Sequence, residues 1–143
     1  MSSPDDTPLA RSVDQARQAL DEVDTEVPST ALPHLRLAAE HLSAAIDAAM
    51  ASAILEEGAT IRTAGALAGL SENAVGPRLA RTRDLGAYTA ETGRVTARGV
   101  ERALYDLEQG RHQPAPTAAP AAAPKSAAPL RFRARRPSTR DDA

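Results

Sequence analysis

Apolar residues recur every three or four positions along most of residues 9–109, which is the period of an α-helix. The first stretch, about 9–23, has an apolar stripe formed by Val13, Ala16, Leu20 and Val23. A longer stretch, about 33–57, predicts a second helix whose stripe faces a helical core. That stripe is formed by Leu35, Leu42, Ile46, Ala49, Ala53 and Ile54.

The polar positions complete this picture of the long helix. Arg36, Glu40 and Asp47 lie opposite its stripe, where we expect a solvated face. Pro28 and Pro33 predict a break before it, because proline lacks the N–H group that a helix interior needs. The second helix is therefore expected to begin at Pro33, a position that suits a first turn. Its N-terminal half either packs in the core or pairs with the first helix, within the chain or across a dimer.

Two short helical patterns meet at Gly69 inside the stretch 60–82. Thr60 and Ser71 are suited to cap them, since both side chains accept a hydrogen bond from a free backbone N–H group. The expected buried positions are Ile61, Ala64, Leu67 and Ala68 in the first helix, and Val75 and Leu79 in the second. Gly65, four residues before the turn, allows a close helix crossing, so a helix-turn-helix is expected.

This stretch resembles the helix-turn-helix of bacterial transcription regulators, in the pattern Gly65, Gly69, Leu70, Ser71 and Val75. The resemblance implies binding in the major groove of DNA. After it, a short hairpin at 89–95 with its turn at Gly93, and a helix at 97–109 that opens with Thr96 and Gly99, are similar to winged regulators. We therefore expect a mainly α fold with a winged helix-turn-helix domain at 42–109, an acidic helical extension at 9–41, and disorder at 1–8 and 110–143.

Charge is distributed unevenly along the chain. Residues 1–57 have three arginines and eleven acidic residues, a net charge of −8, whereas residues 111–143 have seven basic and two acidic residues. The last segment is rich in proline and alanine, and we expect it to add non-specific affinity for a polyanion. The acidic helices would face away from DNA and form a homodimer or bind a separate protein partner.

The stretch 60–82 and its neighbours supply the candidate contacts with double-stranded DNA. Asn73 and Arg81 are the expected base readers, because asparagine pairs with adenine and arginine with guanine. Phosphate contacts are expected from residues at helix starts, on the flanks, near the hairpin and in the tail. These are Thr60, Arg62, Ser71, Arg78, Arg83, Arg94, Arg98, Arg131, Arg133, Arg135 and Arg136. Gly76 and Pro77 predict a kink or a separate first turn in the second short helix.

Other functional classes find little support in the sequence. There is no cysteine, and His34 and His41 are two turns apart on one helix, so no metal site, cofactor or catalytic group is expected. No apolar run is long enough to span a bilayer, so a cytoplasmic, nucleoid-associated location is expected. The sequence thus favours a DNA-binding regulator or nucleoid-associated protein. The alternative is an adaptor whose acidic helices bind a protein and whose helix pair is structural.

Overall fold

The computed structural model describes residues 6–115, which fold into five α-helices and one short 3₁₀-helix. The helices are α1 (Pro8–Asp21), α2 (Pro28–Glu56), α3 (Ile61–Leu67), α4 (Glu72–Leu79) and α5 (Ala97–Glu108), with the 3₁₀-helix η2 (Gly86–Tyr88) before α5. Within residues 6–115 the β-structure is limited to one bridge between Thr89 and Val95. The fold is therefore mainly helical, as the sequence predicted.

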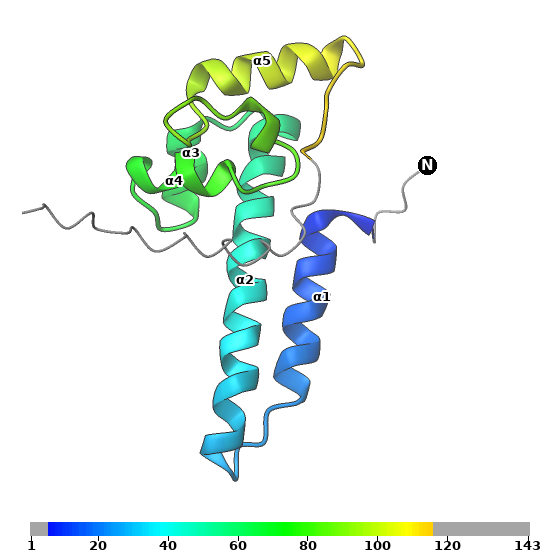
Figure 1. Ribbon diagram of the computed structural model, residues 1–143, viewed down its shortest axis with the longest axis vertical. Helices are drawn as coiled ribbons and strands as arrows, with labels where there is room; N and C mark the ends of the chain where they lie inside the picture. The colour runs from blue at the N-terminus through cyan, green and yellow to red at the C-terminus, as the bar shows by residue number, and fades with distance from the viewer. Residues whose placement is uncertain (1–5, 116–143) are drawn as a thin grey trace, which may run out of the picture.

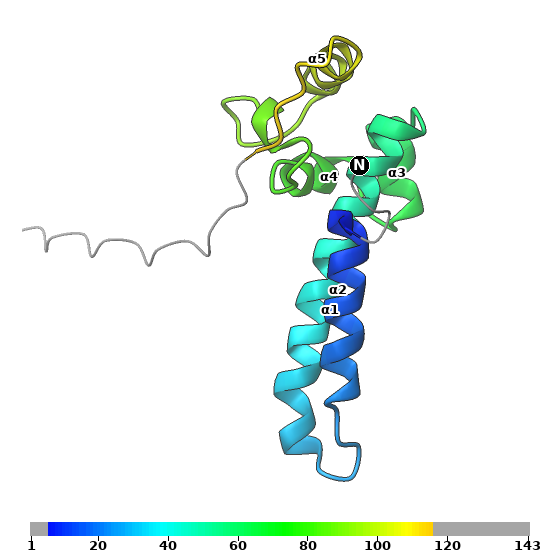
Figure 2. The same ribbon diagram turned by 90° about the vertical axis from the view of Figure 1, so that its right-hand side faces the viewer.

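The long helix α2 connects two parts of the molecule (Figure 1). Its N-terminal half pairs with α1 and forms what we call the stalk, residues 8–45. Its C-terminal half enters a compact group with α3, α4, η2 and α5, which we call the head, residues 46–115. The stalk helices run side by side in both views (Figure 2). Of the pairings left open by the sequence, the one within the chain is observed.

Small residues form the contact between the stalk helices. Ala16 and Ala19 of α1 are buried, as are Ala31, Ala38 and Ala45 of α2. Alanine allows two helices to approach closely but buries little area, so each contact contributes modestly to stability. The stalk consequently places its alanines inside, while Leu20, Leu35 and other large side chains stay about half exposed.

The predicted break at the two prolines is wrong. Helix α2 begins at Pro28, and Pro33 lies inside it. Pro28 occupies the first helical position, where the missing N–H group would have had no partner. Pro33 removes one hydrogen bond in the second turn, but its acceptor residue Ser29 is exposed, so water can replace that bond.

The predicted core face of α2 is also corrected. Ile54 is fully buried, but Leu35, Leu42 and Ile46 are 44%, 46% and 43% exposed. In contrast Asp47, expected on a solvated face, is only 7% exposed. The head packs against a side of α2 that shares only Ile54 with the predicted stripe, because its core contains Met50, Ala51 and Ile54 of this helix.

The core of the head joins all its elements. Besides the three residues of α2, it contains Ala64, Val75, Leu79, Leu85, Tyr88, Val95 and Ala103. Leu67 was predicted to belong to it, yet this side chain is 81% exposed.

The side chain of Thr96 caps α5 by accepting a hydrogen bond from Gly99, as predicted. A Cβ atom on Gly99 would lie 2.5 Å from the carbonyl oxygen of Tyr88, so α5 docks on η2 through this glycine.

Residues 111–115 leave α5 and return along η2, although the sequence predicted disorder from residue 110. The ring of His112 stacks on Tyr88 with 5.5 Å between centroids, and its Nε2 atom lies 2.8 Å from the carbonyl oxygen of Asp84. The Tyr88 hydroxyl donates to Asp106 at 3.1 Å. Burial raises the pKa of Tyr88 above its usual value. At the other end, α1 begins at Pro8 with Thr7 as its cap, so the predicted disorder is wrong for Thr7 and Pro8, while residues 1–5 lie outside the described residues.

Candidate nucleic-acid interface

Helices α3 and α4 cross closely at Gly65. A Cβ atom on Gly65 would lie 2.6 Å from Cγ2 of Val75, a side chain that is fully buried. Gly69 has a φ of +69°, which favours glycine, and the turn is closed by a 2.8 Å hydrogen bond from the Leu70 N–H to the Gly65 carbonyl. Thr60 caps α3 by accepting a hydrogen bond from the Thr63 N–H at 3.0 Å. The predicted helix pair with a glycine turn is therefore present.

Helix α4 is continuous from Glu72 to Leu79, without the predicted separate first turn. Pro77 leaves the Asn73 carbonyl without its helical partner, and the Arg94 guanidinium donates to that oxygen at 3.4 Å. Next to it, Gly76 accepts a hydrogen bond from the Val95 N–H at 3.0 Å. A Cβ atom on Gly76 would lie 2.9 Å from the Val95 carbonyl oxygen. The Gly76-Pro77 pair is thus the point where the 89–95 hairpin docks on α4.

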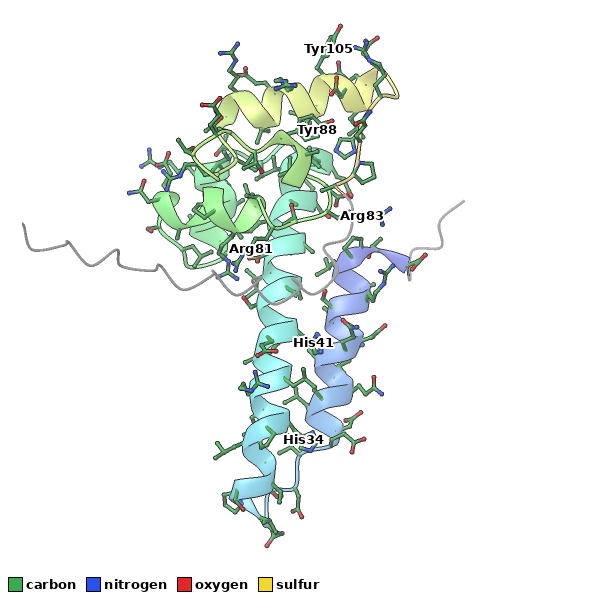
Figure 3. The ribbon with its side chains drawn as sticks, in the orientation of Figure 1. His34, His41, Arg81, Arg83, Tyr88 and Tyr105 are labelled. Carbon is green, nitrogen blue, oxygen red and sulfur yellow. The ribbon has the colours of Figure 1, made fainter. Side chains whose placement is uncertain are left out.

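The exposed side of α4 differs in part from the sequence prediction. Val75 and Leu79 are buried and Asn73 and Pro77 are exposed, as expected. Helix α4 ends at Leu79, however, so Arg81 lies beyond it and is not on the helix that the sequence assigned to it. Its side chain, labelled in Figure 3, points toward α2. It is 67% exposed and lies 3.5 Å from the Asp47 carboxylate.

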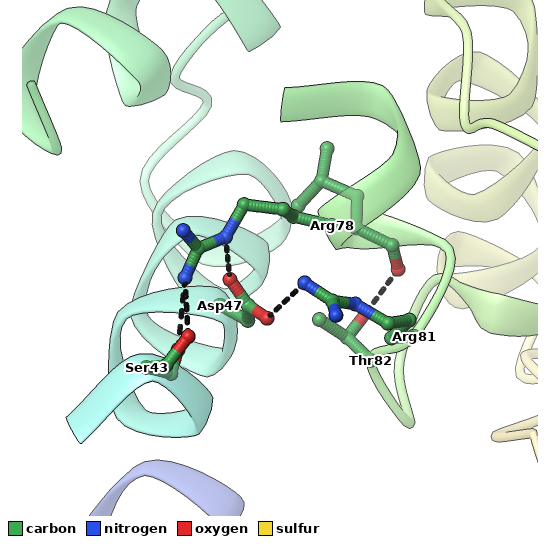
Figure 4. A network of polar contacts seen from close by, with 6 residues as sticks. Ser43, Asp47, Arg78, Arg81 and Thr82 are labelled. Carbon is green, nitrogen blue, oxygen red and sulfur yellow. Dashed lines mark hydrogen bonds and ion pairs between the residues drawn. The ribbon is translucent and has the colours of Figure 1, made fainter. Parts of the chain in front are cut away.

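Arg78 is turned toward α2 and away from the solvent. Its guanidinium forms an ion pair with Asp47 and donates to the Ser43 hydroxyl at 2.8 Å (Figure 4). The side chains of Arg78 and Asp47 are only 21% and 11% exposed. Because Arg78 is occupied in this way, we do not include it among the proposed DNA contacts. Sequence reasoning missed the role of Asp47; its one signal was a single acid inside the apolar-rich run 42–55.

The structure brings four of the predicted residues to one groove. The groove is lined by Thr60 at the cap of α3, Arg62 of α3, Asn73 of α4 and Arg94 of the hairpin, together with the start of α5. Among the described residues, neither Arg62 nor Arg94 forms an ion pair. Glu72 and Glu101 line the same groove, so its formal charge is balanced. Within residues 6–115, Arg94 forms no ion pair with Glu91 or Glu101, the two acidic residues that the sequence places nearest to it.

The remaining predicted residues lie elsewhere. Ser71 is at the start of α4 and exposed, but its side chain makes no capping hydrogen bond. Arg83 is exposed beside α1 (Figure 3), and Arg98 is exposed on α5 with no ion-pair partner in the part of the chain that the structure describes. Arg131, Arg133, Arg135 and Arg136 lie outside the described residues.

In residues 6–115 no cluster of three or more histidine, cysteine, aspartate or glutamate side chains is suited to hold a metal ion. None of the helices there has the length and the apolar character that a membrane crossing requires.

Comparison with known proteins returned no match to a family model, to a curated protein or to a solved structure. The likeness to helix-turn-helix regulators therefore stays a prediction from the sequence.

Proposed function

We propose that this protein binds double-stranded DNA through α3 and α4, as a winged helix-turn-helix protein whose wing is the short 89–95 hairpin. The observation that supports this most is the geometry of α4. Its Val75 and Leu79 side is buried, while Asn73 and Pro77 on the other side are free to meet a partner. A short, exposed second helix after a close glycine crossing is the arrangement that places a helix in the major groove.

The residues divide into different roles in this proposal. Asn73 reads base edges near the start of α4, while Arg62 and Arg94 contact phosphates beside it. Arg81 lies past the end of α4, and we expect it to contact a DNA phosphate as well. Because Pro77 offers no hydrogen-bond donor to a base, we expect contacts with the DNA backbone to dominate. That balance favours a nucleoid-associated protein over a regulator of a few sites.

A titration of fluorescent duplexes, followed by anisotropy at several salt concentrations, tests this function. The full chain should bind unrelated duplexes, and log affinity should fall steeply with log salt. Replacing Arg62 and Arg94 together by alanine should weaken binding by about tenfold or more and lower the salt slope by about two, since each phosphate contact contributes about one.

A matched control is Arg36→Ala. Arg36 is an exposed arginine of the stalk, paired with Glu40 and remote from the groove. Its replacement should leave affinity and salt slope nearly unchanged. Absence of binding at low salt would refute the DNA proposal and leave the adaptor function predicted from the acidic helices. Equal losses from Arg36→Ala and from the groove variant would show that only net charge matters.

A further inference from the structure

One face of α2 has an unpartnered heptad repeat. Its apolar residues are separated alternately by three and four positions, which is the spacing of helices that pack in a coiled coil. The residues are Leu32, Leu35, Ala39, Leu42, Ile46, Ala49 and Ala53. Within the described chain, the four large side chains stay 66%, 44%, 46% and 43% exposed in sequence order. A surface helix of a monomer has no need for such a repeat on its open side.

Neither neighbour of α2 covers this face. Helix α1 packs on one side of α2 through Ala38 and Ala45, and the head packs on the other through Met50 and Ile54 (Figure 1). The heptad face lies between these two sides. Near the head it continues into a groove whose far wall is α3, with Ala64, Leu67 and Ala68.

We propose that the heptad face binds the same face of a second copy of this chain, with the two α2 helices antiparallel. The order of large and small residues supports this arrangement. An antiparallel pair centred on Leu42 places Leu32 opposite Ala53, Leu35 opposite Ala49, and Ala39 opposite Ile46. Apart from the central Leu42, which meets its own copy, each large side chain then faces a small one, and interlocking large and small residues fill a core without voids or overlap.

A parallel pair fits less well. It would place Leu32 against Leu32 and Ala39, Ala49 and Ala53 each against its own copy, which leaves gaps between the helices. The antiparallel pair also brings Leu32 and Leu35 of one copy to the alanine-lined groove beside α3 of the other. Leu67, which is 81% exposed in the single chain, lines this groove and therefore lies at the edge of the proposed contact.

The charge and the area of the heptad face both fit a second copy of this chain as the partner. None of the seven stripe residues is charged, although residues 1–57 have a net charge of −8, so two acidic stalks meet without burying like charges. The face is about 30 Å long and, with α1 beside it, about 20 Å wide. This gives about 600 Å² per copy before α3 is counted, close to the area of about 800 Å² per partner in stable complexes.

The two-fold symmetry of this pair suits DNA binding, an agreement that rests on the proposed function. A two-fold axis through the Leu42 pair keeps both heads on one side and both α1 helices on the other, because they flank α2 on opposite sides (Figure 1). The two Ile54 residues, where the heads attach, would be about 36 Å apart along the helices. One turn of DNA separates half-sites by about 34–36 Å.

Sedimentation equilibrium of the full chain at micromolar concentrations tests the pairing without DNA. The wild type should be a dimer. Leu42→Glu, which places two carboxylates opposite each other, should raise the dimer dissociation constant by about tenfold or more. Leu42 is half exposed in the single chain, so the variant should keep the helical circular dichroism of the wild type. A monomeric wild type, or a Leu42→Glu variant that dimerises equally well, would overturn the proposal.

Leu37→Glu is the matched control, because Leu37 is 40% exposed on the opposite side of α2 and should not alter the dimer. Crosslinking tests the direction, since the chain has no cysteine of its own. A mixture of Ala39→Cys and Ile46→Cys chains should form mixed disulfides faster than either chain forms with itself. Faster self-crosslinking of Ala39→Cys would refute the antiparallel order. Because this readout needs no DNA, it separates failure of the dimer from failure of the DNA-binding proposal.

Discussion

Asp47→Ala is expected to lower the free energy of unfolding by about 2–3 kcal/mol. Asp47 is the carboxylate that neutralises Arg78, and both side chains are largely shielded from water. Removing one partner of a buried ion pair leaves the other charge uncompensated, which costs about 3–5 kcal/mol when burial is complete. We reduce this value because one fifth of the Arg78 side chain is exposed and Ser43 still accepts from it. Urea denaturation measures the change.

Two variants show whether the loss comes from this pair. Arg81→Ala removes the exposed, 3.5 Å partner of the same carboxylate and should cost at most about 1 kcal/mol. Replacing both Asp47 and Arg78 by leucine should recover most of the stability, because apolar residues can substitute for a buried ion pair. If Asp47→Ala and Arg81→Ala had equal effects, the buried pair would not be the link between α4 and α2.

Gly65→Ala is expected to destabilise the protein by about 2 kcal/mol. The new methyl group would meet the Val75 side chain at 2.6 Å, and Val75 is fully buried in the core of the head. Overpacking of this kind costs about 1–3 kcal/mol, and the better helix propensity of alanine recovers up to about 1 kcal/mol. The helix crossing should widen, so the variant should also bind DNA less tightly if α3 and α4 form the interface.

A double-mutant cycle isolates the crossing. Gly65→Ala in a Val75→Ala background should cost much less than in the wild type, because the atom that clashes is gone. Thr63→Ala, an exposed substitution on the same helix, gives the baseline for a neutral change, although it also removes a hydroxyl contact with Thr60. A Gly65→Ala cost that is the same in both backgrounds would show that Val75 does not determine the spacing of α3 and α4.

Local patterns in the sequence predicted much of the secondary structure. Thr60 and Thr96 cap their helices, and Gly69, Gly93 and Gly110 adopt the positive φ values that end helices or form turns. These features depend on a few neighbouring residues, so they can be recognised without knowledge of the fold. The same holds for the buried positions of α4, since Val75 and Leu79 follow one short helical face.

The candidate site could be predicted only in part. The sequence placed Asn73 correctly on the exposed side of α4, but it treated Arg78 and Arg81 as free cations. Their state depends on Asp47, which is 31 residues away from Arg78 along the chain. The pattern of α4 alone contains no information on a carboxylate that a different helix brings to it. Likewise, the sequence of α4 does not predict that the Arg94 guanidinium donates to the Asn73 carbonyl, which lacks its helical partner because of Pro77.

The sequence by itself determined that the chain is mainly helical and where its glycine turns lie, because hydrophobic period, caps and glycines act over a few residues. The tertiary structure alone decided which side of α2 is covered. A helical period gives α2 several apolar faces, and only the placement of α1 and the head selects among them. That selection buried Ala38 and Ile54, and it left Leu35, Leu42 and Ile46 about half exposed.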